Sequence, residues 1–165
     1  MSDLPEPTDD IDPIDMVEII SDHRGLDYDR ISDDQIAMAI AGQWKTYSVT
    51  IAWMPSDETL RLICSFELEP PVEKISALYE LLNLINDKCW AGHFTFWKAE
   101  NTMVFRYTLL LIGEQMVNQE QIDTMMSAST ASCERFYPAI GLVLWDDASP
   151  EKALASAFKP GYGRA

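Results

Sequence analysis

Three stretches of alternating large and small side chains, joined by short turns, constrain the fold more than any other feature of the sequence. Large apolar side chains occupy every second position of residues 35–41, 44–54 and 59–68. Gly42-Gln43 separates the first two stretches, and Pro55-Ser56-Asp57-Glu58 separates the last two. Successive side chains of a β-strand point to opposite faces, and short connections join antiparallel neighbours. The sequence therefore predicts an antiparallel sheet with one buried face and one wetter face.

Helical patterns flank these strands. Asp12-Pro13 provides an N-cap and a first-turn proline for a helix that ends near Gly25. Residues 72–88 carry a broad apolar stripe with a period of 3.6, which is typical of a central helix lying on a sheet with a second element on its flank. The remaining predicted strands are a short one at 26–31 and a second hairpin formed by 93–98 and 102–112.

The C-terminal third of the chain is predicted to be helical. Asn118 and Gln121 have the spacing of a capping box at the start of a long helix. Pro138 is expected to break or kink this helix, because proline removes one backbone hydrogen bond and clashes with the preceding turn. Residues 140–145 are apolar and fit either a helix or a further strand, and we favour continuation of the helix. Ser149-Pro150-Glu151 caps a last short helix that ends near residue 158.

A chain of 165 residues is long enough to bury its own core and suits one domain. We expect a disordered acidic tail at residues 1–11, a single α+β domain at 12–158 and a flexible tail at 159–165. The predicted order of elements is α-β-β-β(-β)-α-β-β-α, with the helices packed on one face of the antiparallel sheet.

The charge of the chain excludes several classes of protein. It has 27 acidic residues, 12 Lys and Arg and a formal net charge of −15. Residues 1–34 alone contain twelve acidic and two basic residues, a net charge of −10. Nucleic acids and anionic membranes need clustered basic residues, and no apolar run approaches the roughly 20 residues of a membrane span. We therefore expect a cytoplasmic protein that binds neither nucleic acid nor membrane, and whose acidity favours a basic partner in a salt-sensitive interaction.

No arrangement of residues indicates catalysis or metal binding. The two histidines, His23 and His93, lie in no metal-binding motif, and local structural or solvated roles are expected for both. The three cysteines are far apart in apolar surroundings and are predicted to be buried free thiols. They are Cys64, Cys89 and Cys133. Paired acidic residues such as Glu67 and Glu69 fit a solvated face. We predict no catalytic residue, no cofactor and no metal site, and hence a protein that is not an enzyme.

Aromatic residues offer the strongest functional hint. Trp90, Phe94, Phe96 and Trp97 fall within eight residues, and Trp97 alternates with the two phenylalanines along a predicted strand. Most such side chains belong to a core, but the two sides of this strand cannot be buried equally. We predict a hydrophobic surface for a partner subunit or polypeptide at these residues and at two leucines of the preceding helix. The predicted partner-binding residues are Trp90, Phe94, Phe96, Trp97, Leu81 and Leu84.

Two other functions compete with polypeptide binding. A small-ligand sensor or an enzyme could have its pocket near the aromatic second hairpin, with polar neighbours such as Glu67 or Arg106. A purely structural stabilising subunit is the third possibility.

Several segments resemble the YbjN domain family, and the resemblance covers about residues 12–158. The segments that carry it are LRLICSF (60–66), LYELLNLIN (78–86), WAGHFTFW (90–97) and CERFYPA (133–139). The family is described as bacterial sensory transduction regulators, and its fold resembles that of type III secretion chaperones. The resemblance implies a regulatory or chaperone-like protein, often a homodimer, that holds an extended polypeptide. It supplies no catalytic residues and directs attention to the helix at 72–88 and the second hairpin.

Overall fold

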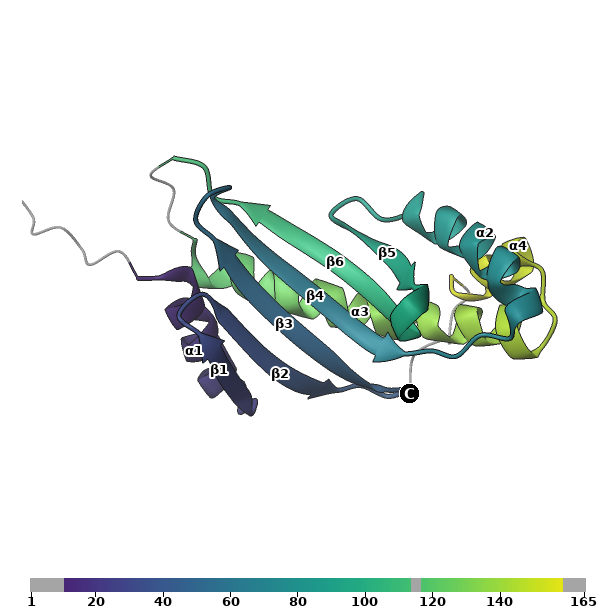
Figure 1. Cartoon of the computed structure of the whole chain (residues 1–165), viewed down its shortest axis with the longest axis horizontal. Coiled ribbons are helices and arrows are strands. Elements are labelled where there is room, and N and C mark those ends of the chain that lie inside the picture. Colours follow the sequence, from purple (N-terminus) through teal and green to yellow (C-terminus); the bar gives the residue numbers. More distant parts are fainter. Residues whose placement is uncertain (1–10, 114–116, 159–165) are drawn as a thin grey trace, which may run out of the picture.

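The computed structural model describes residues 11–113 and 117–158, which form a six-stranded antiparallel sheet backed by helices (Figure 1). The spatial order of the strands is β1-β2-β3-β4-β6-β5. The helices are α1 (Pro13–His23), α2 (Ile75–Asn86), α3 (Gln119–Trp145) and α4 (Pro150–Ser156). The strands are β1 (Tyr28–Ser32), β2 (Gln35–Ala41), β3 (Thr46–Met54), β4 (Thr59–Glu67), β5 (Gly92–Trp97) and β6 (Thr102–Leu110). The predicted α+β class and the order of its elements are confirmed.

Alternation along the strands gives the sheet two unlike faces. The inner face carries the large apolar side chains, including Tyr47, Leu62 and Phe105, and these are buried. The outer face carries small or polar side chains along the same strands, such as Thr50, Ser65 and Thr108. The register aligns these residues in rows, because β3, β4 and β6 pair over most of their length. One face is thus packed and the other is open, as the sequence predicts.

Helices α1 and α3 cover the inner face, and α2 and α4 extend this layer beyond the β5 edge (Figure 1). The prediction that α2 lies centrally on the sheet is wrong. This helix packs against α4, α3 and the edge strand β5, and a single turn of 3-10 helix (Val72–Lys74) precedes it. Its broad apolar stripe reflects three neighbouring elements, each of which covers part of its circumference.

The predicted helix starts are confirmed by their hydrogen bonds. The Asp12 carboxylate accepts from the backbone N–H of Ile14 at 2.8 Å. The Asn118 side chain accepts from the backbone N–H of Gln121 at 2.8 Å, and the Gln121 side chain accepts from the backbone N–H of Asn118 at 3.0 Å. Ser149 caps α4 in the predicted way. These caps satisfy N–H groups that have no partner within the helix.

Pro138 does not break the long helix. Helix α3 runs from Gln119 to Trp145, so residues 140–145 are helical, as favoured from the sequence. Proline lacks an N–H group and cannot donate to the carbonyl one turn earlier. Buried side chains on both sides of it, among them Phe136, Ile140 and Val143, hold the two halves of the helix against the core. Tertiary packing therefore outweighs the local cost of the proline.

Some expectations concern residues that the structure does not describe. The predicted tail at 1–11 lies outside the described residues except for its last residue, and the tail at 159–165 lies outside them entirely. Among the helices in residues 11–113 and 117–158, none has the length and apolar character needed to cross a membrane.

Candidate binding surfaces on the second hairpin

The β5–β6 hairpin divides its side chains between the core and the outer face. Phe94 and Phe96 point inward and are 3% and 8% exposed. Phe94 packs against Phe105 of β6, with ring centroids 4.8 Å apart. Trp97 and His93 belong to the opposite, outer face of β5. The side chains on the two faces of β5 are therefore buried to different extents, as predicted. The reason is that successive side chains of a strand point to opposite faces.

Helix α2 holds the free edge of β5. The Asn86 side chain donates to the carbonyl of Phe94 at 2.9 Å and accepts from the backbone N–H of Phe94 at 2.7 Å. This amide takes the place of a neighbouring strand, so that part of the edge is closed to another chain. Gly92 is required at the start of β5, because a Cβ atom there would lie 2.4 Å from the Phe105 ring and 2.7 Å from the carbonyl of Arg106.

The six residues predicted to bind a partner do not form one surface. Leu81, Phe94 and Phe96 are buried in the core, and Leu84 is half-buried. Trp97 is half-buried on the outer face of β5. Only Trp90 is almost fully exposed, at 98%. The aromatic composition of the segment does not show which of these residues are buried and which are exposed. Burial depends on which elements cover each face of the hairpin.

A groove lies on the inner side of the hairpin, between the α2–β5 loop and α3. Its volume is about 410 Å³. We call it the Trp90 groove and define it by Trp90, Tyr107, Ala131, Arg135 and Phe158, which are among its lining residues. The Arg135 guanidinium lies 4.9 Å from the centre of the Phe158 ring, which places a cation on an apolar wall.

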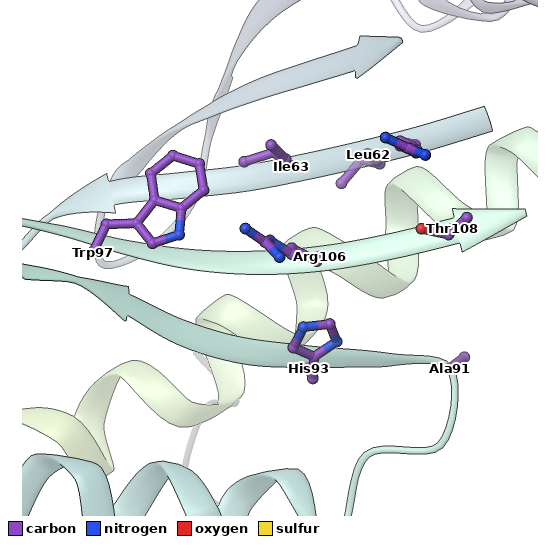
Figure 2. Close-up of a pocket in the computed structure, with 8 residues that line it drawn as sticks. Leu62, Ile63, Ala91, His93, Trp97, Arg106 and Thr108 are labelled. Carbon is purple, nitrogen blue, oxygen red and sulfur yellow. The ribbon is translucent and has the colours of Figure 1, made fainter. Parts of the chain in front are cut away.

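A second hollow lies on the outer face of the same hairpin (Figure 2). Its volume is about 580 Å³. We call it the Arg106 hollow and define it by Arg61, Ile63, His93, Trp97, Arg106 and Thr108. Figure 2 shows Arg106 between Trp97 and His93, and the Arg106 guanidinium lies 5.5 Å from the centre of the Trp97 ring. The register places Ile63, Arg106 and His93 directly opposite one another on three adjacent strands.

Sequence reasoning missed Glu134, which connects α3 to the β2–β3 turn. Its carboxylate accepts from the backbone N–H groups of Gln43 at 2.8 Å and Trp44 at 3.2 Å, and from the Tyr47 hydroxyl. Burial, together with this carboxylate, raises the pKa of Tyr47 above its usual range. A Cβ atom on Gly42 would lie 2.3 Å from Glu134, so the glycine at this turn is also required for close approach. Glu134 has a structural role, and nothing in its local sequence indicates its distant partners.

The cysteines are free thiols. Cys64 and Cys133 are buried with their sulfur atoms 3.6 Å apart, whereas Cys89 is only partly buried and lines the Trp90 groove. Burial raises the pKa of Cys89, which keeps the thiol protonated at neutral pH and a weak nucleophile. Within the described ranges, no three His, Cys, Asp or Glu side chains are grouped so that they could hold a metal ion. What the two surfaces offer is apolar contact and basic hydrogen-bond donors.

A family model matches residues 13–142, most of the chain, and its description is "Putative bacterial sensory transduction regulator". The chain belongs to the YbjN family. The resemblance inferred from the sequence segments is thereby confirmed. All four segments that carry it lie within the matched residues.

Two solved structures align with this YbjN-family chain, and the first shares its fold. The crystal structure of YbjN from E. coli, described as "a putative transcription regulator", aligns with a TM-score of 0.54 and 15% sequence identity, covering 82% of this chain and 90% of that chain. A chain of the HopA1-SchA chaperone-effector complex aligns with a TM-score of 0.48 and 12% identity, covering 70% of this chain and 85% of that chain. None of the curated proteins compared with the chain matches it.

Proposed function

We propose that this YbjN-family protein is a non-enzymatic regulatory domain that binds a polypeptide segment of a partner in the Trp90 groove. One observation carries the proposal: an indole side chain is 98% exposed beside a groove with apolar walls. Burial of a tryptophan removes about 150–250 Å² of surface from water, and tryptophans are enriched among the residues that dominate binding energies.

The position of Trp90 supports a role in binding rather than in folding. Its side chain contributes nothing to the core, so a large aromatic residue is not needed there for stability. Two of the adjoining walls belong to β6 and α3, which contribute Tyr107 and Ala131. Walls formed by regular secondary structure lose little conformational entropy when a ligand binds.

Charge near the groove limits the segment that fits. The charged lining residues are Lys88 and Arg135, which are both basic. We therefore propose a segment with an apolar anchor and a neutral or acidic flank. The acidity of the whole chain predicts a basic partner, and the proposed flank differs from that prediction because none of the residues that line the groove is Asp or Glu. Homodimer formation and a cytoplasmic location also stay predictions, and sedimentation analysis tests the first.

The experiment is a selection of peptides from a random display library against the full-length protein, followed by measurement of their dissociation constants by fluorescence anisotropy. We expect the selected peptides to share an apolar anchor and to lose about tenfold or more in affinity for Trp90→Ala. Trp145→Ala is the matched control, because Trp145 is an exposed tryptophan at the end of α3 that does not line the groove. Peptides that bind the wild type and Trp90→Ala equally would contradict the proposal.

The non-enzymatic part of the proposal has its own test. We expect the bound peptides to be recovered with unchanged mass after prolonged incubation with the protein. A mass change that depends on the protein would identify chemistry that the described residues do not suggest.

A further inference from the structure

We propose that the Arg106 hollow binds a small organic anion that carries a carboxylate or phosphate group and a planar ring. The site is on the opposite side of the hairpin from the Trp90 groove and does not depend on polypeptide binding there. Its volume of about 580 Å³ is within the range of pockets that hold small molecules, roughly 300–1,000 Å³.

The charge of the hollow is opposite to that of the protein. The formal net charge of the chain is −15, yet none of the eight residues that line the hollow is Asp or Glu. The charged residues among them are Arg61 and Arg106, and His93 adds an imidazole ring whose nitrogens can form hydrogen bonds. Charges beyond about 8 Å are screened at physiological ionic strength, so an anion in the hollow responds to these residues more than to the distant acidic excess.

The Arg106 side chain is exposed, and its guanidinium has no described protein acceptor. Within residues 11–113 and 117–158 no carboxylate forms an ion pair with it, and no hydrogen bond from its side chain is present. Its described contact is with the Trp97 ring, 5.5 Å away. An arginine that lies over an aromatic ring keeps its N–H groups in the plane of the guanidinium, where they can bind two oxygens of one carboxylate or phosphate.

Arg61 is the second donor, although it is partly neutralised. Asp57 forms an ion pair with Arg61, and the Thr59 hydroxyl accepts from the Arg61 Nε at 3.2 Å. Arg61 pairs across the sheet with Thr108, which is two residues from Arg106 along β6. Such diagonal neighbours on one face are about 7–8 Å apart, which two long side chains can bridge to reach one anion. Arg106 is therefore expected to contribute more than Arg61.

Flat apolar surfaces next to these donors select a ring. Trp97 and Ile63 flank Arg106 on the outer face of the sheet, which is the face opposite to helix α3 (Figure 1). Aromatic side chains bind planar rings such as nucleobases by stacking. A ligand with both a ring and an anionic group would thus contact Trp97 through its ring and the arginines through its anion. A ligand with only one of these groups would make only one of the two contacts.

The test is isothermal titration calorimetry of the full-length protein with five probes. Adenosine 5′-monophosphate and indole-3-acetate each combine a ring with an anion, and they distinguish a phosphate from a carboxylate ligand. Adenosine, the neutral alcohol indole-3-ethanol and inorganic phosphate each lack one of the two parts. We expect at least one ring-bearing anion to bind about tenfold or more tightly than each of the three incomplete probes.

Variants locate the binding. Arg106→Gln and Trp97→Leu should each weaken the bound probe by about tenfold or more, and Arg61→Gln by less. Arg135→Gln is the matched control, because this arginine also lies on an aromatic ring but in the Trp90 groove. NMR spectra of the wild type should show the probe shifting the Trp97 indole N–H resonance, which keeps the test valid if a variant is unstable.

Three results would overturn the inference: no ring-bearing anion binds at millimolar concentration, binding is unaffected by Arg106→Gln in a folded variant, or the probe shifts resonances elsewhere only. If no probe binds and Arg106→Gln changes the sedimentation coefficient, the hollow is instead an interface between copies of this chain. Trp90→Ala should retain anion binding, and Arg106→Gln should retain peptide binding, so the two proposals fail separately.

Discussion

Residues 90–97 and 133–139 are both rich in aromatic side chains, but the fold uses them differently. In the second segment, Phe136 packs against Phe94, Tyr137 against Phe66 and Trp44, and Glu134 caps a distant turn. In the first segment, alternate residues enter the core while Trp90 and Trp97 stay at the surface. Both segments carry the family resemblance, yet only the first has an aromatic side chain that is almost fully exposed, namely Trp90.

The difference arises from the elements that hold the two segments. The second lies within α3, which has the sheet on one side, α2 and α4 at its C-terminal half and the β2–β3 turn alongside, so most directions around it are occupied. The first forms a loop and an edge strand, which has one covered face and one open face. Aromatic composition alone therefore does not indicate binding, and the neighbours of the element decide it.

The largest expected effect is that of Phe136→Ala, which tests whether the second segment is structural. Phe136 is buried between Phe94 and Phe158. Removal of a buried phenylalanine side chain costs about 3–5 kcal/mol of the free energy of unfolding, because contacts are lost and a cavity remains. Urea unfolding followed by circular dichroism measures the change. A loss below about 1 kcal/mol would show that this segment contributes little to the core.

Glu134→Ala should have the next largest effect. The substitution leaves two backbone N–H groups and the buried Tyr47 hydroxyl without their acceptor. We expect a loss of about 1–2 kcal/mol in the free energy of unfolding, because the buried Tyr47 hydroxyl loses its partner whereas the N–H groups of Gln43 and Trp44 lie at an exposed turn and can bond to water. Glu134→Gln keeps one oxygen acceptor and should lose less. Equal losses for the two variants would indicate that the hydrogen bonds are unimportant and that only the packing of the side chain matters.

The pH dependence of stability tests whether the interior around residues 133–139 is buried. Hydrogen bonding with Cys64, together with burial, raises the pKa of Cys133, and burial beside Glu134 raises that of Tyr47. Both groups stay protonated in the folded chain while the unfolded chain ionises near the ordinary values of 9.0 and 10.0. The contribution of these two groups to the free energy of unfolding is fully present below pH 9. It decreases above pH 9 for Cys133 and above pH 10 for Tyr47, by about 1.4 kcal/mol per pH unit for each group.

Urea unfolding at a series of alkaline pH values measures this slope. Tyr47→Phe should make the decline shallower above about pH 10, because one ionising group is removed. The assignment of this slope to Cys133 and Tyr47 would be contradicted if the free energy of unfolding stayed constant across this pH range. It would also be contradicted if Tyr47→Phe left the slope unchanged.

The smallest expected effect on stability is that of Trp90→Ala. Because the side chain is exposed, we expect a change within about 0.5 kcal/mol in the free energy of unfolding, together with the loss of peptide affinity described above. The measurement compares this small change in the free energy of unfolding with the large loss expected for Phe136→Ala. A large loss of stability would mean that Trp90 packs in the folded protein in solution, and it would remove the main support for the Trp90 groove.

Much of the fold could be predicted from local patterns. Asp12, Asn118 and Ser149 mark helix starts because capping depends on groups only two or three residues away. Alternation of side chains predicts the strand ends to within two residues. The position of α2 was not predictable, because a broad apolar stripe does not reveal whether its neighbours are strands or helices.

The candidate surfaces were predictable in part. The alternation of Trp97 with Phe94 and Phe96 predicts two unequal faces, and Trp90 and Arg106 were both candidates from the sequence. The involvement of Arg61 was not foreseen, because it lies 45 residues before Arg106 in the chain and reaches the hollow only through pairing of β4 with β6. The expectation that Cys89 is buried was also wrong, because this residue follows α2 in a loop and is only partly covered by its neighbours.

The sequence by itself determined the helix caps, the two-residue period of the strands and the family, because each depends on residues close together in the chain. Tertiary structure alone decided that β6 lies between β4 and β5, and so brought Arg61, Arg106 and Trp97 to one open face while Phe94 and Phe136 met in the core. The physical reason is that burial is a property of the neighbours a side chain acquires when distant elements pack, and strand order sets those neighbours.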